Sequence, residues 1–194
     1  MTETPVYIMA VPWDVARLKR ANDIRKAVGG KIVLDQVKNV MDTFRLVLAT
    51  VKMDGDGPFF LMQDDIQLTS DWREKAEALV AERPDMINQF FAMESEANAV
   101  AFGSRERKGD TFISNLCVYF PEGYASQLLD YSFEFVEKYP KFATADDFVV
   151  RYWLRSRRED YYLHYPSLVQ HESWVSAINS KRPRNRRSHF WDGE

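Results

Sequence analysis

The sequence predicts an α/β fold in which helices flank a central, mostly parallel β-sheet. Along the first 82 residues, short apolar runs alternate with longer segments whose apolar residues recur at helical spacing. An order of strand, helix, strand and helix needs crossover connections, and these favour parallel strands. A length of 194 residues, with 45% hydrophobic and 28% charged residues, suits one globular domain, and no repeat or linker divides the chain.

The first half of the chain supplies three strands and three helices in alternation. The expected elements, in order, are strand 5–11, helix 13–28, strand 31–35, helix 39–53, strand 59–62 and helix 72–82. Gly29 and Gly30 end the first helix, and the run Asp54–Pro58 is a turn after the second. Ser70 or Asp71 can cap the third helix.

The second half of the chain is less regular. The expected elements are strands at 85–91, 97–103 and 112–120, helices at 121–139 and 143–154, and one or two short strands within 161–169. The polar run between Gly103 and Asp110 is expected to be a mobile loop. Pro121 ends the strand before it, and Pro140 ends the helix before it. After His171 the sequence predicts no regular structure.

The composition indicates a cytoplasmic protein. No apolar run approaches the roughly 20 residues that a membrane-spanning helix needs. The N-terminal residues lack the basic start and apolar segment of a secretory signal. Cys117 is the only cysteine, so it cannot form an internal disulfide, and its apolar neighbours indicate that it packs in the core.

Charge is unevenly distributed along the chain. Residues 1–150 carry 17 Lys and Arg against 24 Asp and Glu, whereas residues 151–194 carry 9 against 5. The basic residues of this last part form two clusters: Arg151, Arg155, Arg157 and Arg158, and Lys181, Arg182, Arg184, Arg186 and Arg187. Such clusters suit a phosphate-bearing partner, either a nucleotide or DNA. The alternative is a solvated helix face followed by a charged chain end.

Acidic residues and a histidine stand at the ends of predicted elements. Asp64 and Asp65 directly follow the third strand, Asp146 and Asp147 begin the last helix, and His171 follows the last predicted strand. Ligands of an open α/β sheet bind beyond the carboxyl ends of its strands. Carboxylate oxygens suit Mg²⁺ or Mn²⁺, and manganese also accepts imidazole. The alternative interpretation is structural: a turn, a helix N-terminus that favours acids, and a hydrogen-bonded surface histidine.

In this order the motifs resemble those of the GT-A glycosyltransferases, especially the small bacterial and phage-type members. Val6–Val11 resembles the strand that contacts the nucleotide, and Leu61–Leu68 resembles the acidic metal motif, written D-x-D or E-D-D. Ala145–Val150 is similar to the helix that carries an acceptor-side acid, and Tyr165–His171 to the strand that delivers a histidine. Gln63 departs from the pattern because it stands where E-D-D has its first acid.

The resemblance covers nearly the whole chain and implies a single-domain, GT-A-like (Rossmann-like) fold. Residues 1–72 would mainly bind a nucleotide-sugar, 103–171 would form the acceptor side, and 172–194 would be a basic tail. Asp65 and His171 would hold Mn²⁺ or Mg²⁺ between the phosphates of a UDP- or GDP-sugar. Either Asp147 or Asp146 would be the acceptor base if the enzyme inverts configuration.

On the donor side, the resemblance implies contacts from the first two strands and the first helix. Val11 would contact the nucleotide, Arg17 the donor phosphates, and Asp35 the base or ribose. Asp64 would contact the ribose or sugar, or share the metal. Trp174 is the aromatic residue best suited to stack on a sugar.

The predicted activity is transfer of a sugar from a nucleotide-diphosphate donor to a hydroxyl. The acceptor is either a 5-hydroxymethylated pyrimidine in DNA, flipped out of the stack and held by Arg151, Arg155, Arg158, Arg184, Arg186 and Arg187, or a glycan or protein hydroxyl. Two other classes stay open: a nucleotidyl- or phosphoryl-transferase, and a non-catalytic nucleic-acid-binding module. No G-x-x-x-x-G-K-[ST] loop is present, which argues against a P-loop enzyme.

Overall fold

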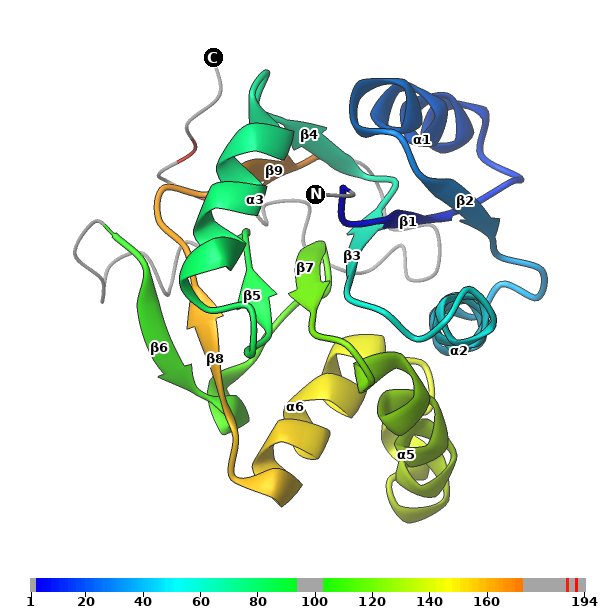
Figure 1. Ribbon diagram of the computed structural model, residues 1–194. Coiled ribbons are helices and arrows are strands. Elements are labelled where there is room, and N and C mark those ends of the chain that lie inside the picture. Colours follow the sequence, from blue (N-terminus) through cyan, green and yellow to red (C-terminus); the bar gives the residue numbers. More distant parts are fainter. Residues whose placement is uncertain (1–2, 94–102, 173–187, 189–190, 192–194) are drawn as a thin grey trace.

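The computed structural model describes residues 3–93, 103–172, 188 and 191, and its central feature is a seven-stranded sheet (Figure 1). Its strand order is β2-β1-β3-β7-β5-β8-β6, and β4 and β9 form a second, two-stranded sheet. The strands are β1 (Val6–Ala10), β2 (Lys31–Leu34), β3 (Phe59–Gln63), β4 (Ile66–Leu68), β5 (Asn88–Gln89), β6 (Arg105–Lys108), β7 (Cys117–Phe120), β8 (Asp160–Leu163) and β9 (Val169–His171). The α-helices are α1 (Val15–Val28), α2 (Val40–Met53), α3 (Trp72–Glu82), α5 (Tyr124–Lys138) and α6 (Asp146–Arg157).

The sheet confirms the predicted α/β class. β1 pairs in parallel with β2 and β3, and β5 pairs in parallel with β8. β7 is antiparallel to β3 and β5, and β6 is antiparallel to β8. Five of the seven strands (β2, β1, β3, β5 and β8) therefore run in one direction, and their carboxyl ends lie at one edge of the sheet.

Helices cover both faces of the sheet, which explains why β1 and β7 are apolar without alternation. On β1, Ile8 packs on the face of α1 and α3, while Tyr7 and Met9 pack on the face of α2, α5 and α6. β3 repeats this pattern, with Phe60 on the first face and Phe59 on the second. Helices α2, α5 and α6 gather on one side in Figure 1, and this arrangement leaves the carboxyl edge of the strands as the place for a site.

Four predictions about local structure were wrong. The polar run after Gly103 is not a mobile loop but contains β6, an edge strand whose charged residues suit a position with one unpaired side. The strand predicted from Phe112 begins only at Cys117, after a 3₁₀ turn at Gly109–Thr111, and the strand predicted over 85–91 is reduced to β5. The short loop expected after the third strand contains β4. Most of the strand predicted at 97–103 lies outside the described residues.

Gly30 provides a test of the β1–α1–β2 packing. Its φ is +106°, and a Cβ atom there would lie 2.4 Å from the carbonyl oxygen of Val6. Gly30→Ala is therefore expected to lower the free energy of unfolding by at least about 2 kcal/mol in urea denaturation. Gly57→Ala is the matched control, because no atom lies within 4 Å of its Cβ position and its φ is outside the left-handed region. Equal stability of the two variants would contradict this packing.

Within the described residues, no helix has the length and apolar character that crossing a bilayer requires.

Candidate functional site

The acid pair predicted to be functional forms the two-residue turn between β3 and β4, at the carboxyl edge of the sheet. Asp64 is 1% exposed, and its Oδ2 accepts a 2.7 Å hydrogen bond from the backbone N–H of Val11, directly after β1. This bond joins the ends of two parallel neighbours, β1 and β3. Asp64 and Val11, two predicted site residues, are thus in direct contact.

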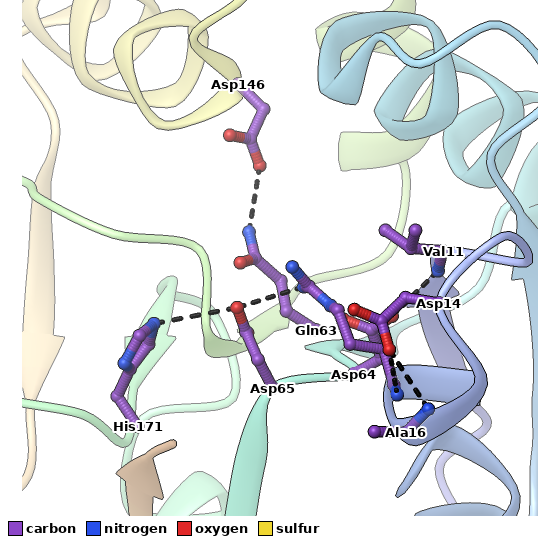
Figure 2. A network of polar contacts seen from close by, with 9 residues as sticks. Val11, Asp14, Ala16, Gln63, Asp64, Asp65, Asp146 and His171 are labelled. Atoms are coloured by element: carbon purple, nitrogen blue, oxygen red, sulfur yellow. Dashed lines mark hydrogen bonds and ion pairs between the residues drawn. The ribbon is translucent and has the colours of Figure 1, made fainter. Parts of the chain in front are cut away.

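Arg17 of α1 holds both carboxylates of this turn. Its Nε donates to Asp64 Oδ1 at 2.8 Å, and its Nη2 donates to the same oxygen and to Asp65 Oδ2 at 2.9 Å. The helix begins beside the site because Asp14 caps it, accepting from the N–H groups of Ala16 and Arg17 at 3.0 and 3.2 Å (Figure 2). One buried guanidinium therefore faces two carboxylates.

The ionisation of these groups reflects their burial. Burial raises the pKa of Asp64 to about 6, although Arg17 favours the ionised carboxylate. Burial also opposes the charge of Arg17, but Asp65 and Asp64 outweigh it, so the pKa of the guanidinium is raised. The cation is therefore permanent, while Asp64 titrates close to the physiological range.

The structure also brings Asp65 and His171 together. His171 Nε2 lies 3.6 Å from Asp65 Oδ2, and the two side chains face each other in Figure 2. Their closeness follows from the β4–β9 pairing, in which His171 is the register partner of Ile66. The N–H of Glu172 donates to the carbonyl of Asp65 at 2.8 Å, and its carboxylate pairs with Arg20 of α1 at 2.5 Å. The β4–β9 pairing and the two contacts of Glu172 thus hold His171 beside Asp65.

The pair offers a fit for a divalent cation. Asp65 Oδ1 is buried and has no hydrogen-bond partner among the described residues, although a buried carboxylate oxygen is expected to have one. A carboxylate oxygen and an imidazole nitrogen are ligands that Mn²⁺ accepts. Among the residues that the structure describes, no group of three or more His, Cys, Asp or Glu side chains could hold a metal. In the described part of the chain, Asp65 and His171 are thus the candidate ligands.

Asp146, at the start of α6, reaches the same edge of the sheet. Its Oδ2 accepts from Gln63 Nε2 at 3.4 Å (Figure 2). The same oxygen accepts from Asn115 Nδ2 at 3.1 Å. Burial, with a contribution from the neighbouring charge of Asp147, raises the pKa of Asp146 to about 7. Asp147 itself is half-buried, and its Oδ1 accepts only from the N–H of Phe148 among the described residues.

Sequence reasoning missed Asn115 and the role of Gln63. Asn115 is 1% exposed and lies, next to Ser114, in the mostly apolar run before β7. A polar side chain in a run that reads as a buried strand was the available signal, because buried amides need partners. Gln63 is the last residue of β3, and its N–H bonds to the carbonyl of Leu116 at 3.0 Å, so both amides approach Asp146 from adjacent strands.

Asp35 lies at the same edge but has an evident structural role. Its N–H bonds to the carbonyl of Ala10, and its Oδ1 accepts from the N–H groups of Val37 and Asn39 at 2.9 and 3.3 Å. The carboxylate therefore shapes the connection between β2 and α2. Its position beside the end of β1 is compatible with the predicted contact to a base or ribose.

The basic residues proposed for DNA are only partly described. Arg151 and Arg155 belong to α6, and Arg158 is its left-handed C-cap, at the helix end opposite Asp146. Arg184, Arg186 and Arg187, most of the basic tail, and Trp174 lie outside the described residues. His164 is a core residue, stacked on Phe90 and bonded through Nε2 to Asn88 Oδ1 at 2.7 Å.

Replacing Asp146 by asparagine is expected to remove a pH-dependent loss of stability. An unfolded aspartate has a pKa of about 3.9. The native state therefore binds more protons than the unfolded state between about pH 4 and pH 7, and the wild type loses stability as the pH rises through this window. In urea unfolding, the free energy of unfolding of Asp146→Asn relative to the wild type should increase by on the order of 2–4 kcal/mol from pH 4 to pH 8. The exposed Asp130→Asn should show no such gain, and a pH-independent difference for Asp146→Asn would contradict its burial as a carboxylic acid.

Comparison with known proteins supports the fold. No protein-family model and no curated protein sequence matches the chain. A glycosyltransferase involved in the glycosylation of the major capsid of PBCV-1 matches it with a TM-score of 0.53 and 9% identity, over 90% of this chain and 85% of its own. A candidate glucose-1-phosphate thymidylyltransferase from Bacillus anthracis matches with a TM-score of 0.46 and 13% identity, over 87% of this chain and 89% of its own. The first match shows that the chain has a glycosyltransferase-like fold.

Proposed function

We propose that this chain is a glycosyltransferase that moves a sugar from a nucleoside-diphosphate donor to a hydroxyl acceptor. The observation that carries the proposal is the network in which Asp64 and Asp65 join Val11, Arg17 and His171 at the carboxyl edge of the sheet. Donor chemistry fits this edge, because the ends of β1 and β2 border it and ligands of open α/β sheets bind there.

On the donor side, Asp65 and His171 would hold Mn²⁺ or Mg²⁺. When bound, this ion would neutralise the negative charge that develops on the departing diphosphate. Arg17 uses Nε and Nη2 for the two carboxylates, and its Nη1 would contact a phosphate oxygen of the donor. Asp64 would fix Arg17 and Val11 and, with Asp35, contact the ribose or base.

On the acceptor side, Asp146 is the better candidate for the base. It is buried, oriented by two amides, and has its pKa raised to about 7, near the value at which a general base works best. In an inverting reaction the acceptor oxygen attacks the anomeric carbon and the bond to the diphosphate oxygen breaks. The proton of the acceptor hydroxyl then passes to the carboxylate. Asp147 is the alternative base.

Two acceptor classes are proposed, and they differ in whether they need contacts to phosphates. A 5-hydroxymethylated pyrimidine in DNA would need phosphate contacts, and Arg151, Arg155 and Arg158 on α6 are the described residues that could make them. A glycan or protein hydroxyl needs no such contacts. DNA affinity measured across a salt series separates the two, because a flat response would rule out phosphate contacts.

Calorimetric titration of UDP- and GDP-sugars, with and without Mn²⁺, tests the proposal. At least one nucleotide-sugar is expected to bind, and more tightly by roughly tenfold or more when Mn²⁺ is present, since the metal would join protein and diphosphate. Absence of binding by every donor in the presence of Mn²⁺ would refute the glycosyltransferase assignment. A mass-spectrometric assay against glycans, peptides and hydroxymethylated DNA then identifies the acceptor.

A further inference from the structure

Two neutral amides, Gln63 and Asn115, meet at one oxygen of Asp146. Gln63 Nε2 lies 3.4 Å and Asn115 Nδ2 lies 3.1 Å from Asp146 Oδ2. Gln63 ends β3 and Asn115 precedes β7, so two adjacent strands converge on the first residue of α6. Both groups donate, and a carboxylate accepts such bonds best when it is ionised.

We propose that Gln63 and Asn115 are positioning residues that hold Asp146 in one orientation and favour its ionised form at the acceptor side of the site. The acceptor-side role of Asp146 rests on the proposed function, whereas the contacts among these three side chains do not. It also explains why a glutamine stands at position 63, where an acid was expected.

The electrostatic surroundings show why donors are needed. Asp146 is 6% exposed, so burial penalises its charge. Asp147, on the same helix, is the charged neighbour that acts most strongly on it, and it also disfavours ionisation. From the end of β3, Asp64 and Asp65 are turned to Arg17. The Asn115 amide and the N–H groups of Asp146 and Asp147 favour the charged form. Gln63 adds a second amide donor at 3.4 Å.

A carboxylate in place of Gln63 would reverse this effect. An acidic side chain at that position would bring a like charge to within about the present 3.4 Å of Asp146, and adjacent carboxylates resist joint ionisation. A glutamine has nearly the same shape and carries two donors instead. Gln63, next to the acid pair, therefore donates a hydrogen bond to Asp146 and does not add a third acid.

The first test is a thermodynamic cycle that needs no activity. Gln63→Leu removes one donor, so the native pKa of Asp146 should rise further and stability should be lost over a longer pH range. Between pH 6 and pH 9, the unfolding equilibrium constant of Gln63→Leu should rise by up to about tenfold relative to the wild type. In an Asp146→Asn background, Gln63→Leu should show no pH-dependent effect.

Gln67→Leu is the matched control, because Gln67 is a half-buried glutamine on β4 with no described contact to Asp146. Asn115→Ser provides a second variant of the pair and should shift the pH dependence in the same direction as Gln63→Leu. If Gln63→Leu shows the same pH dependence with and without Asp146, the proposal is overturned, whatever the protein catalyses.

The second test uses Gln63→Glu and separates a positioning role from a metal-binding one. A positioning role predicts that the acid limb of the transfer rate moves to higher pH and that Mn²⁺ affinity stays within about twofold of wild type. Tighter Mn²⁺ binding with retained transfer would place Gln63 among the metal ligands and overturn the proposal. If the wild type transfers no sugar while the thermodynamic cycle shows the expected pH dependence, the proposed function is wrong. The positioning of Asp146 by Gln63 and Asn115 is then still supported.

Discussion

Asp65→Asn is expected to lower kcat/KM for sugar transfer by roughly 10²–10³-fold, the loss typical of removing one preorganised electrostatic contact to a transition state. Asp65 is the residue at which the described site converges: Oδ2 faces Arg17 and His171, while Oδ1 is buried and without a partner. Asparagine keeps the shape of the side chain but removes the negative charge that would bind a divalent cation beside the diphosphate.

The control for this variant is Asp85→Asn. Asp85 also forms an ion pair with an arginine, Arg83, but its side chain is 70% exposed and far from the turn between β3 and β4 along the sheet. Activity should be unchanged in the control, and circular dichroism should show a native fold in both. Full activity of Asp65→Asn would mean that the metal, if one is used, is held elsewhere.

The sheet was predictable where strands are buried on both faces. Val6–Ala10 is apolar throughout, and Phe59–Gln63 is apolar as far as Met62. The helices between these strands carry their own stop signals, such as Gly29. β6 was not predictable in this way, because Arg105–Lys108 has charged residues at every position and its hydrogen bonds to β8 are non-local. Whether such a segment forms an edge strand depends on its pairing in the folded protein, which no local sequence pattern indicates.

The position of the acid pair in the fold could be predicted from the sequence, but the contacts that each acid makes could not. The acid pair follows a strand, and that fact alone places it at the ligand-binding edge. The sequence could not distinguish Asp64, which is enclosed by Val11 and Arg17, from Asp65, which retains an oxygen without a partner. Nor could it choose between the acids of α6, because burial of Asp146 by Asn115 depends on a contact 31 residues apart.

Arg17→Met is expected to destabilise the protein by about 3–5 kcal/mol at pH 8, the cost of leaving buried charges without their partner. The side chains of Arg17 and Asp64 are 9% and 2% exposed, so solvent screening does little to reduce the effect. Arg20→Met is the matched control on the same helix. Arg20 pairs with Glu172 but is 33% exposed, and its loss should cost at most about 1 kcal/mol.

The pH dependence identifies the origin of that cost. Without Arg17, the native pKa of Asp64, already raised to about 6 by burial, should rise further, while the unfolded value stays near 3.9. A carboxyl group whose native pKa is raised stabilises the fold fully below its unfolded pKa, and this stability is lost as the pH rises through the native pKa. The deficit of Arg17→Met should thus be smallest near pH 4 and grow toward pH 8. Thermal unfolding across this range measures it, and a deficit that is constant with pH would show that Arg17 contributes packing alone, with the two carboxylates stabilised by other groups.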